Sequence, residues 1–227
     1  MRLVIHIPAR KGSKRVPRKN FRDLCGKPMI EYSIMSAIKA NITDEIYINT
    51  DDVELADLMV SKHPELKFFN RDTSLTGDKS SSDDFNFDFI NSTNPDVLMM
   101  INPVCPLVNE KMIVDTYKYF VNNDYDTVIS ASKSQMQFFC KDQPININLD
   151  EKLAPSQENS PVYELNWAIT IWECKTFVNN MKSKGFAVLG TKLGIFEIDK
   201  FAGLKVSNEN DFLAIEALIK GGYEDRL

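Results

Sequence analysis

The stretch that decides the fold is Ile7-Pro8-Ala9-Arg10-Lys11-Gly12-Ser13-Lys14-Arg15-Val16-Pro17-Arg18-Lys19-Asn20. It follows an apolar run of strand length at residues 3–7 and precedes a pattern of helical spacing that begins near Pro28. A continuous apolar run of this length is expected of a parallel strand that is buried on both faces. The chain therefore opens with strand, loop and helix, which predicts a layered α/β fold.

The loop is basic although the formal net charge of the protein is −5. Its six basic residues fall within ten positions: Arg10, Lys11, Lys14, Arg15, Arg18 and Lys19. Gly12 lets backbone N–H groups approach a ligand, and the cationic side chains offset the charge of an anion. This composition predicts a site for a phosphate chain, and the alternative is a solvated basic turn or a nucleic-acid patch. The loop does not match the Walker P-loop, because no Gly-Lys-Ser/Thr follows at the required spacing.

Composition limits the class of protein. A chain of 227 residues is long enough for one substantial domain, here expected to span residues 1–227. A hydrophobic content of 43% and a charged content of 26% are ordinary for a soluble globular protein. The sequence pI of about 5.2 argues against a general nucleic-acid binder, so the basic loop favours a small anionic ligand.

The cysteines and the N-terminus indicate the compartment. The four cysteines are widely spaced without a Cys-x-x-Cys pair, which indicates neither a zinc cluster nor a disulfide framework. With only two histidines, a histidine-based metal site is not expected. Cys105 has no histidine in a recognisable partner position and is expected to be a small buried residue. The chain passes from Met1-Arg2 directly into a strand, so we expect a cytoplasmic protein without a membrane span.

Strand-like and helix-like segments alternate along the remaining chain. Strands are predicted at residues 3–7, 45–49, 67–69, 97–101, 127–131, 164–172 and 194–198. Helices are predicted from near residue 28, after residues 52 and 82, and at 110–121 and 211–219. This alternation predicts a doubly wound, mostly parallel sheet with the most apolar run, 97–101, at its centre. The helix after residue 52 is expected to bury Leu55, Leu58 and Met59.

Asp51 follows the predicted strand at residues 45–49. Ligands collect at the carboxyl ends of strands in open α/β sheets, which makes this carboxylate a candidate site residue. An aspartate in this position is equally suited to cap the helix that follows. Both interpretations stay open from the sequence.

The spacing Ala9-Arg10-x-Gly12-Ser13-Lys14-x-x-Pro17-x-Lys19-Asn20 resembles the opening signature of the acylneuraminate cytidylyltransferases. These are the CMP-sialic acid synthetases and their relatives. The resemblance implies a Rossmann-like nucleotidyltransferase fold with a small hairpin-like dimerisation arm, here residues 133–165. It also implies CTP and an acidic sugar as partners, Mg²⁺ as cofactor, and a homodimer.

The resemblance assigns roles to individual residues. Arg10, Lys14 and Lys19 would neutralise the triphosphate during phosphoryl transfer. The nucleotide would be bound by Ala9, Arg10, Gly12, Ser13, Lys19, Asn20, Arg71, Asp78, Ser80 and Asn102. The sugar would be bound by Asn102, Asn166 and Thr170. For Ser80 and its neighbours Ser81 and Ser82, an N-cap role is an equal alternative.

Two segments that would line the sugar pocket depart from the pattern of the family. Asn102-Pro103-Val104-Cys105-Pro106-Leu107 stands where the family has Gln-Pro-Thr-Ser-Pro-Leu, so an amide is kept and two hydroxyls are lost. Trp167 replaces a glycine and Thr170 replaces a tyrosine. These changes favour an acceptor other than standard sialic acid.

The metal site departs further. The family binds Mg²⁺ through an Asp-x-Asp before the last helix, and Lys205-Val206-Ser207 occupies that place here. Asp211 is the remaining candidate metal ligand, or only a helix cap. Three hypotheses stay open: Lys205 replaces the cation, CTP and another carboxylate such as Asp51 or Asp78 hold the metal, or the protein binds nucleotide without efficient catalysis.

We therefore expect a cytidylyltransferase that activates a sialic-acid-like sugar with CTP, giving a CMP-sugar and pyrophosphate. One alternative is a nucleotidyltransferase for another phosphorylated acceptor. The other is a catalytically impaired nucleotide-binding homologue.

Overall fold

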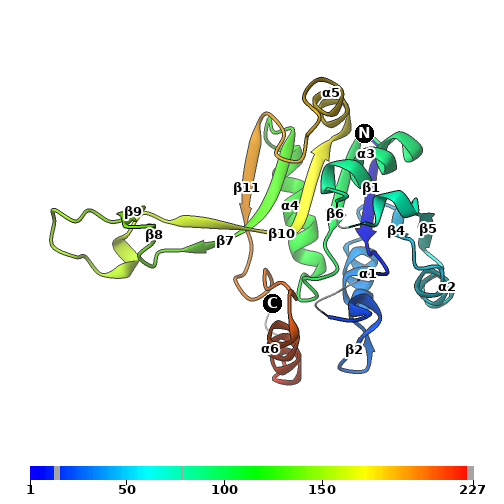
Figure 1. Ribbon diagram of the computed structural model, residues 1–227, viewed down its shortest axis with the longest axis horizontal. Coiled ribbons are helices and arrows are strands. Elements are labelled where there is room, and N and C mark those ends of the chain that lie inside the picture. The colour runs from blue at the N-terminus through cyan, green and yellow to red at the C-terminus, as the bar shows by residue number, and fades with distance from the viewer. Residues whose placement is uncertain (13–15, 78, 224–227) are drawn as a thin grey trace.

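A seven-stranded sheet with the order β11-β7-β10-β6-β1-β4-β5 forms the centre of the computed structural model, which describes residues 1–12, 16–77 and 79–223 (Figure 1). Its strands are β1 (Leu3–Pro8), β4 (Ile46–Thr50), β5 (Leu66–Asn70), β6 (Val97–Ile101), β7 (Thr127–Ser134), β10 (Val162–Glu173) and β11 (Leu193–Glu197). Neighbouring strands are parallel except around β10, which is antiparallel to both β6 and β7. The predicted mostly parallel sheet is confirmed, and β6 lies at its centre with every residue buried.

Helices cover both faces of the sheet. They are α1 (Met29–Ala40), α2 (Val53–Lys62), α3 (Ser82–Thr93), α4 (Glu110–Val121), α5 (Cys174–Lys184) and α6 (Glu209–Lys220). One core cluster packs the sheet against α1, α2 and α4, and a second packs it against α3 and α5. A third joins α6 to α1 and to the hairpin of β2 (Asp23–Leu24) and β3 (Lys27–Pro28). Among the described residues, no helix has the length and apolar character needed to cross a bilayer.

One expectation about a helix was wrong, and one helix was not predicted. Leu58 is 38% exposed, because α2 turns Leu55, Ala56 and Met59 toward the sheet and leaves Leu58 on the solvent side. The helix α5 was not predicted, because only Cys174, Phe177 and Asn180 of its eleven residues are buried. A face this narrow gives a weak helical pattern in the sequence.

An antiparallel ribbon occupies the segment for which an arm was predicted, residues 133–165. Here β7 and β10 continue beyond the body as an antiparallel ribbon, with Ser134 opposite Val162 and Lys133 opposite Tyr163. The far part of the arm carries the short strands β8 (Phe139–Cys140) and β9 (Gln143–Pro144) and the 3-10 turn η3 (Ser156–Glu158). Figure 1 shows the arm extending far from the sheet. Its role in dimerisation stays a prediction.

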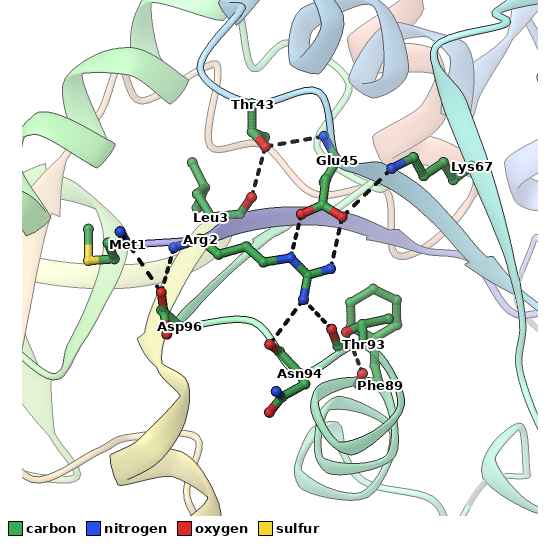
Figure 2. A network of polar contacts seen from close by, with 10 residues as sticks. All are labelled: Met1, Arg2, Leu3, Thr43, Glu45, Lys67, Phe89, Thr93, Asn94 and Asp96. Atoms are coloured by element: carbon green, nitrogen blue, oxygen red, sulfur yellow. Dashed lines mark hydrogen bonds and ion pairs between the residues drawn. The ribbon is translucent and has the colours of Figure 1, made fainter.

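A charged network closes the amino end of the parallel strands (Figure 2). Arg2 donates from Nε and Nη2 to the Glu45 carboxylate at 2.6 and 2.8 Å, and Lys67 approaches the same group at 3.7 Å. Arg2 also donates from Nη1 to the carbonyl oxygens of Thr93 and Asn94 at the end of α3. These bonds tie β1, β4 and α3 together at the edge that lies opposite the basic loop.

Candidate functional site

The carboxyl ends of β1, β4, β5 and β6 meet at one edge of the sheet, where ligands bind in open α/β folds. The basic loop follows β1, and Ala9 at its start is buried and donates to the Asn49 carbonyl at 2.9 Å. Gly12 lies in this loop and is exposed. The predicted site residues Ser13, Lys14 and Asp78 lie outside the described residues, so their roles stay predictions.

Two carboxylates at the end of β4 anchor the start of the basic loop. Asp51 Oδ1 accepts a hydrogen bond from the Lys11 amide at 2.8 Å. Asp52 caps α2 by accepting from the Leu55 amide at 3.4 Å, and its Oδ1 lies 3.9 Å from Lys11 Nζ. The helix cap is therefore Asp52, whereas Asp51 holds the loop. Arg10 contacts the segment after β5, where its Nη1 donates to the Thr76 carbonyl at 3.3 Å.

The 3-10 turn η1 (Lys19–Phe21) connects the loop to the segment before α6. Lys19 Nζ donates to the Val206 carbonyl at 3.1 Å, and the Val206 amide donates to the Val104 carbonyl at 2.8 Å. Asn20 Nδ2 donates to the Arg10 carbonyl at 3.4 Å, while its buried Oδ1 accepts no hydrogen bond from the described residues. A buried amide oxygen without a donor is a candidate ligand-binding atom, because leaving it unpaired costs free energy.

Arg71 follows β5 and is almost fully buried at this edge. Its Nε donates to Asn49 Oδ1 at 2.8 Å, its Nη2 donates to the Asn49 carbonyl at 2.9 Å, and its guanidinium covers the Phe85 ring. Burial lowers the pKa of Arg71 to about 10, Asp51 raises it, and repulsion from Arg10 lowers it further. Arg71 therefore stays charged at neutral pH, close enough to Arg10 for an anion to relieve their repulsion.

The turn after β6 brings Asn102 and Cys105 to the same edge. Asn102 is half-buried, and its Oδ1 accepts from the Val104 amide at 3.4 Å. Burial raises the pKa of the Cys105 thiol to about 12, and the charges of Lys205 and Lys19 lower it only in part. The thiol is therefore protonated at neutral pH, which agrees with the expectation of a small buried residue.

Asn166 supports a β-bulge in β10, between Leu165 and Thr170. Its Oδ1 accepts from Ser130 Oγ at 2.6 Å and from the Ala168 amide at 3.1 Å, and its Nδ2 donates to Ser132 Oγ at 3.1 Å. Trp167 within the bulge has a φ of 59°, the conformation for which glycine is favoured. The contacts of Asn166 are thus structural, and its role in sugar binding stays a prediction.

Thr170 and Ser80 both hold a buried hydroxyl that no described residue bonds. Thr170 is fully buried in mid-strand, paired with Met100 and Ile129, rather than exposed at the edge. Ser81, not Ser80, caps α3 in a reciprocal pair of bonds with Asp84. The cap therefore leaves the Ser80 hydroxyl available, and the substrate roles of both residues stay predictions.

The segment before α6 is built for a helix cap. Asp211 Oδ2 accepts from the amides of Ser207 and Asn208 at 2.7 and 3.0 Å, and Asn208 Oδ1 caps the helix in return. Across residues 1–12, 16–77 and 79–223, no three His, Cys, Asp or Glu side chains gather where they could hold a metal ion. The described carboxylates at this edge, Asp51 and Asp52, both contact Lys11, so these residues do not form a set of protein ligands for Mg²⁺.

Sequence reasoning missed Asn49, which bonds both Ala9 and Arg71. The available signal was a pair of polar residues, Asn49-Thr50, at the end of an apolar strand whose last three positions are all buried. A polar side chain buried in such a strand needs a hydrogen-bond partner, but the sequence does not identify the partner.

Comparison with known proteins shows the family of this chain. The family model described as "Cytidylyltransferase" matches residues 4–186. The pseudaminic acid cytidylyltransferase of Campylobacter jejuni (strain 81-176) is 35% identical over 132 residues. The match spans 56% of this chain and 56% of that relative, about half of its length. The post-translational flagellin modification protein B of Campylobacter coli is 26% identical over 94% of this chain and 93% of its own.

Solved structures share the fold. A CMP:2-keto-3-deoxy-manno-octonic acid synthetase complexed with CTP superposes with a TM-score of 0.72 at 15% identity, covering 98% of this chain and 100% of its own. The 4-diphosphocytidyl-2C-methyl-D-erythritol synthase of Anaerococcus prevotii gives 0.69 at 14% identity, with 96% and 98% covered. Because the family model matches most of its length, the chain belongs to the cytidylyltransferase family, in which it is similar to the acylneuraminate-type members.

Proposed function

We propose that this protein activates an acidic, sialic-acid-like sugar with CTP, giving a CMP-sugar and pyrophosphate. The observation that carries the proposal is the convergence of Arg10, Lys19 and Arg71 at one edge of the sheet, beside the unpaired amide oxygen of Asn20. The names of three relatives support this choice of acceptor, because they refer to pseudaminic acid, N-acylneuraminate and diacetyllegionaminic acid.

The proposed reaction needs charge and alignment more than acid–base groups. The anomeric hydroxyl of the sugar forms a bond to the α-phosphorus of CTP, the bond from that phosphorus to the bridging oxygen breaks, and pyrophosphate leaves. The hydroxyl proton passes to solvent. Neither histidine of the chain is suited to take this proton: His6 is fully buried with its pKa lowered to about 3, and His63 contacts Glu31 at the end of α2. Cations at the edge would stabilise the charge that develops on the phosphates.

Mg²⁺ enters the proposal without assigned protein ligands. The resemblance implies the ion, but the described carboxylates nearest the edge hold the loop or cap helices. The charge of Lys205 reaches the Cys105 thiol on the turn after β6, and so does the charge of Lys19. We therefore propose that lysines supply part of the positive charge that a protein-bound ion would supply, and activity is to be measured with and without Mg²⁺.

The test is pyrophosphate release from CTP with a panel of nine-carbon and eight-carbon acidic sugars. The expected result is CTP-dependent release with at least one sugar, together with a product whose mass is that of the CMP-sugar. Arg10→Ala is the matched loss-of-function control. Absence of release with every sugar of the panel would overturn the proposal.

A second candidate is a nucleotide-binding homologue with impaired catalysis. It is favoured by Lys205 and Ser207 before α6 and by the capping role of Asp211. Calorimetry separates the two candidates, since the homologue would bind CTP without releasing pyrophosphate.

A third candidate, transfer to another phosphorylated acceptor, is motivated by Val104-Cys105 and Trp167. It would give a product with a diphosphate linkage, which mass spectrometry distinguishes from a CMP-linked acid.

We further propose a homodimer formed through the arm. Five of its large apolar side chains are at least half exposed: Met136, Phe139, Ile145, Leu149 and Leu153. An isolated ribbon has no core of its own, and apolar side chains gathered on it favour contact with another protein surface.

The cytoplasm is the proposed compartment, because all four cysteines are free thiols, as expected in a reducing environment.

A further inference from the structure

A chain of buried polar side chains crosses three neighbouring strands directly below the basic loop. His6 lies on β1, Asn49 on β4, and Arg71 follows β5, and their exposed fractions are 0%, 0% and 5%. Asn49 Nδ2 lies 3.2 Å from His6 Nδ1, and Asn49 Oδ1 accepts from Arg71 Nε at 2.8 Å. One amide thus contacts a side chain on either side of its strand.

The chemistry of the partners gives this chain a single direction. A guanidinium only donates, so the Asn49 oxygen faces Arg71 and its NH₂ group faces His6. That NH₂ group needs an unprotonated Nδ1, which leaves the proton of the neutral imidazole on Nε2. Burial, and then repulsion from Arg71, lowers the pKa of His6 to about 3, so the neutral ring persists at physiological pH.

The backbone of Asn49 provides a second pair of bonds. Its carbonyl accepts from the Ala9 amide at 2.9 Å and from Arg71 Nη2, also at 2.9 Å. Ala9 is the first residue after β1 and immediately precedes Arg10. One residue therefore fixes both the guanidinium of Arg71 and the start of the basic loop.

We propose that Asn49 is a positioning residue that holds Arg71 and the basic loop in one relative placement for an anionic ligand. Without its side chain, the buried Nε of Arg71 would lose its acceptor, which is costly. The guanidinium is also repelled by Arg10, so it would turn away from the edge. Binding of an anion would then have to restore the lost orientation, and affinity would fall.

The binding test rests on the proposed function and uses a double-mutant cycle with CTP calorimetry. We expect Asn49→Ala to raise the Kd about tenfold, the factor that corresponds to one lost hydrogen bond to a charged group. In an Arg71→Ala background, we expect Asn49→Ala to change the Kd less than about twofold, because it acts through Arg71. Full additivity of the two substitutions would overturn the proposal.

Asn180→Ala is the matched control. Asn180 is also a buried asparagine, but its Nδ2 donates to Thr191 Oγ1 beside the start of β11, at the amino end of the sheet. We expect it to lower the melting temperature without changing the Kd for CTP. An equal change of Kd in Asn180→Ala would mean that loss of stability, not positioning, explains Asn49→Ala.

A second measurement uses the ligand-free protein and decides the positioning role even if no CTP binds. ¹⁵N NMR is expected to show His6 with its proton on Nε2 and the Arg71 Nε–H protected from exchange. Asn49→Asp keeps the shape and the acceptor for Arg71 but cannot donate to His6. We therefore expect His6 to move its proton to Nδ1, from which it can donate to the introduced carboxylate. In Asn49→Ala the Arg71 Nε–H loses its acceptor and is expected to lose its protection from exchange. Retained protection would overturn the positioning role, whereas absence of CTP binding by the wild type would overturn only the proposed function.

Discussion

At the scale of a residue, Arg71 shows how a buried cation is oriented without its charge being neutralised. Its hydrogen bonds go to the neutral amide and carbonyl oxygens of Asn49. The nearby charges of Asp51 and Arg10 act on its pKa in opposite directions. A carboxylate in the place of Asn49 would offset the charge that an anionic ligand is to meet. Neutral acceptors orient the guanidinium and leave its charge to act on the ligand.

Cys105 gives a prediction about what the site does not need. We expect Cys105→Ala to leave the kcat of pyrophosphate release within about twofold, because a thiol with its pKa raised to about 12 is no nucleophile at neutral pH. The unfolding free energy should fall by about 1 kcal/mol through lost packing. Steady-state kinetics and thermal unfolding measure both, with Cys174→Ala, another buried cysteine, as the control. A hundredfold loss of kcat in a folded Cys105→Ala protein would contradict this assignment.

The segment before α6 gives a second prediction at this scale. The double substitution Lys205→Asp/Ser207→Asp adds two carboxylates and removes one cation beside the turn after β6. We expect pyrophosphate release by this variant to require Mg²⁺ more strongly than release by the wild type, since the carboxylates add metal ligands. Rates are measured over a Mg²⁺ titration for both proteins.

Glu209→Gln is the control for a change of charge nearby. Glu209 lies on the first turn of α6 and forms an ion pair with Arg22. The same Mg²⁺ dependence in the wild type and the double variant would contradict a charge role for Lys205. Activity that appears only in the double variant would favour the impaired homologue.

At the scale of elements, α1 and α2 are joined by a buried carboxylate. Glu31 of α1 accepts from Lys62 Nζ at 2.8 Å and contacts His63 Nε2 at 3.2 Å, at the end of α2. Burial alone would raise the pKa of Glu31, but the hydrogen bonds from Lys62 and His63 outweigh it and hold that pKa below its usual range. These contacts thus join two helices that pack on the same face of the sheet.

This contact predicts a pH dependence of stability. A carboxylate with a lowered folded-state pKa stabilises the fold above its unfolded-state pKa of about 4.3, and the contribution is lost as the pH falls through the folded-state value. We expect Glu31→Gln to lower the unfolding free energy at pH 7 by about 1–2 kcal/mol. Urea unfolding at pH 7 and pH 3 should show this difference narrowing toward pH 3. The exposed Glu65 provides the control substitution Glu65→Gln, and a pH-independent difference for Glu31→Gln would contradict the argument.

The elements that the sequence predicted are those with a strong local pattern. Continuous apolar runs identified the strands β1 and β6, and the amphipathic pattern gave α4 with its observed bounds. The pattern of α5 was too polar to be recognised. The basic loop was found because its charges are contiguous, whereas Asn49 was missed because its partners are 43 and 22 residues away in the chain. A contact between strands leaves no local trace in a sequence.

At the scale of the whole molecule, the two ends of the sheet differ in kind. The amino end is closed by ion pairs around Arg2 and Glu45 (Figure 2). The carboxyl end gathers Arg10, Lys19 and Arg71 in a protein of net charge −5. Cations gathered at this end attract an anion even though the molecule as a whole repels it.

The arm makes the last prediction, which concerns assembly. Light scattering after size exclusion should give the wild type twice the 25.9 kDa mass of the chain, because two arms can cover each other's apolar side chains. Ile145→Asp/Leu149→Asp places two charges among those side chains, and we expect this variant to be a monomer. Val121→Asp, at an exposed apolar position of α4 in the body, should remain a dimer. A monomeric wild type at micromolar concentration, or a dimer that survives both arm substitutions, would show that the apolar arm serves another contact.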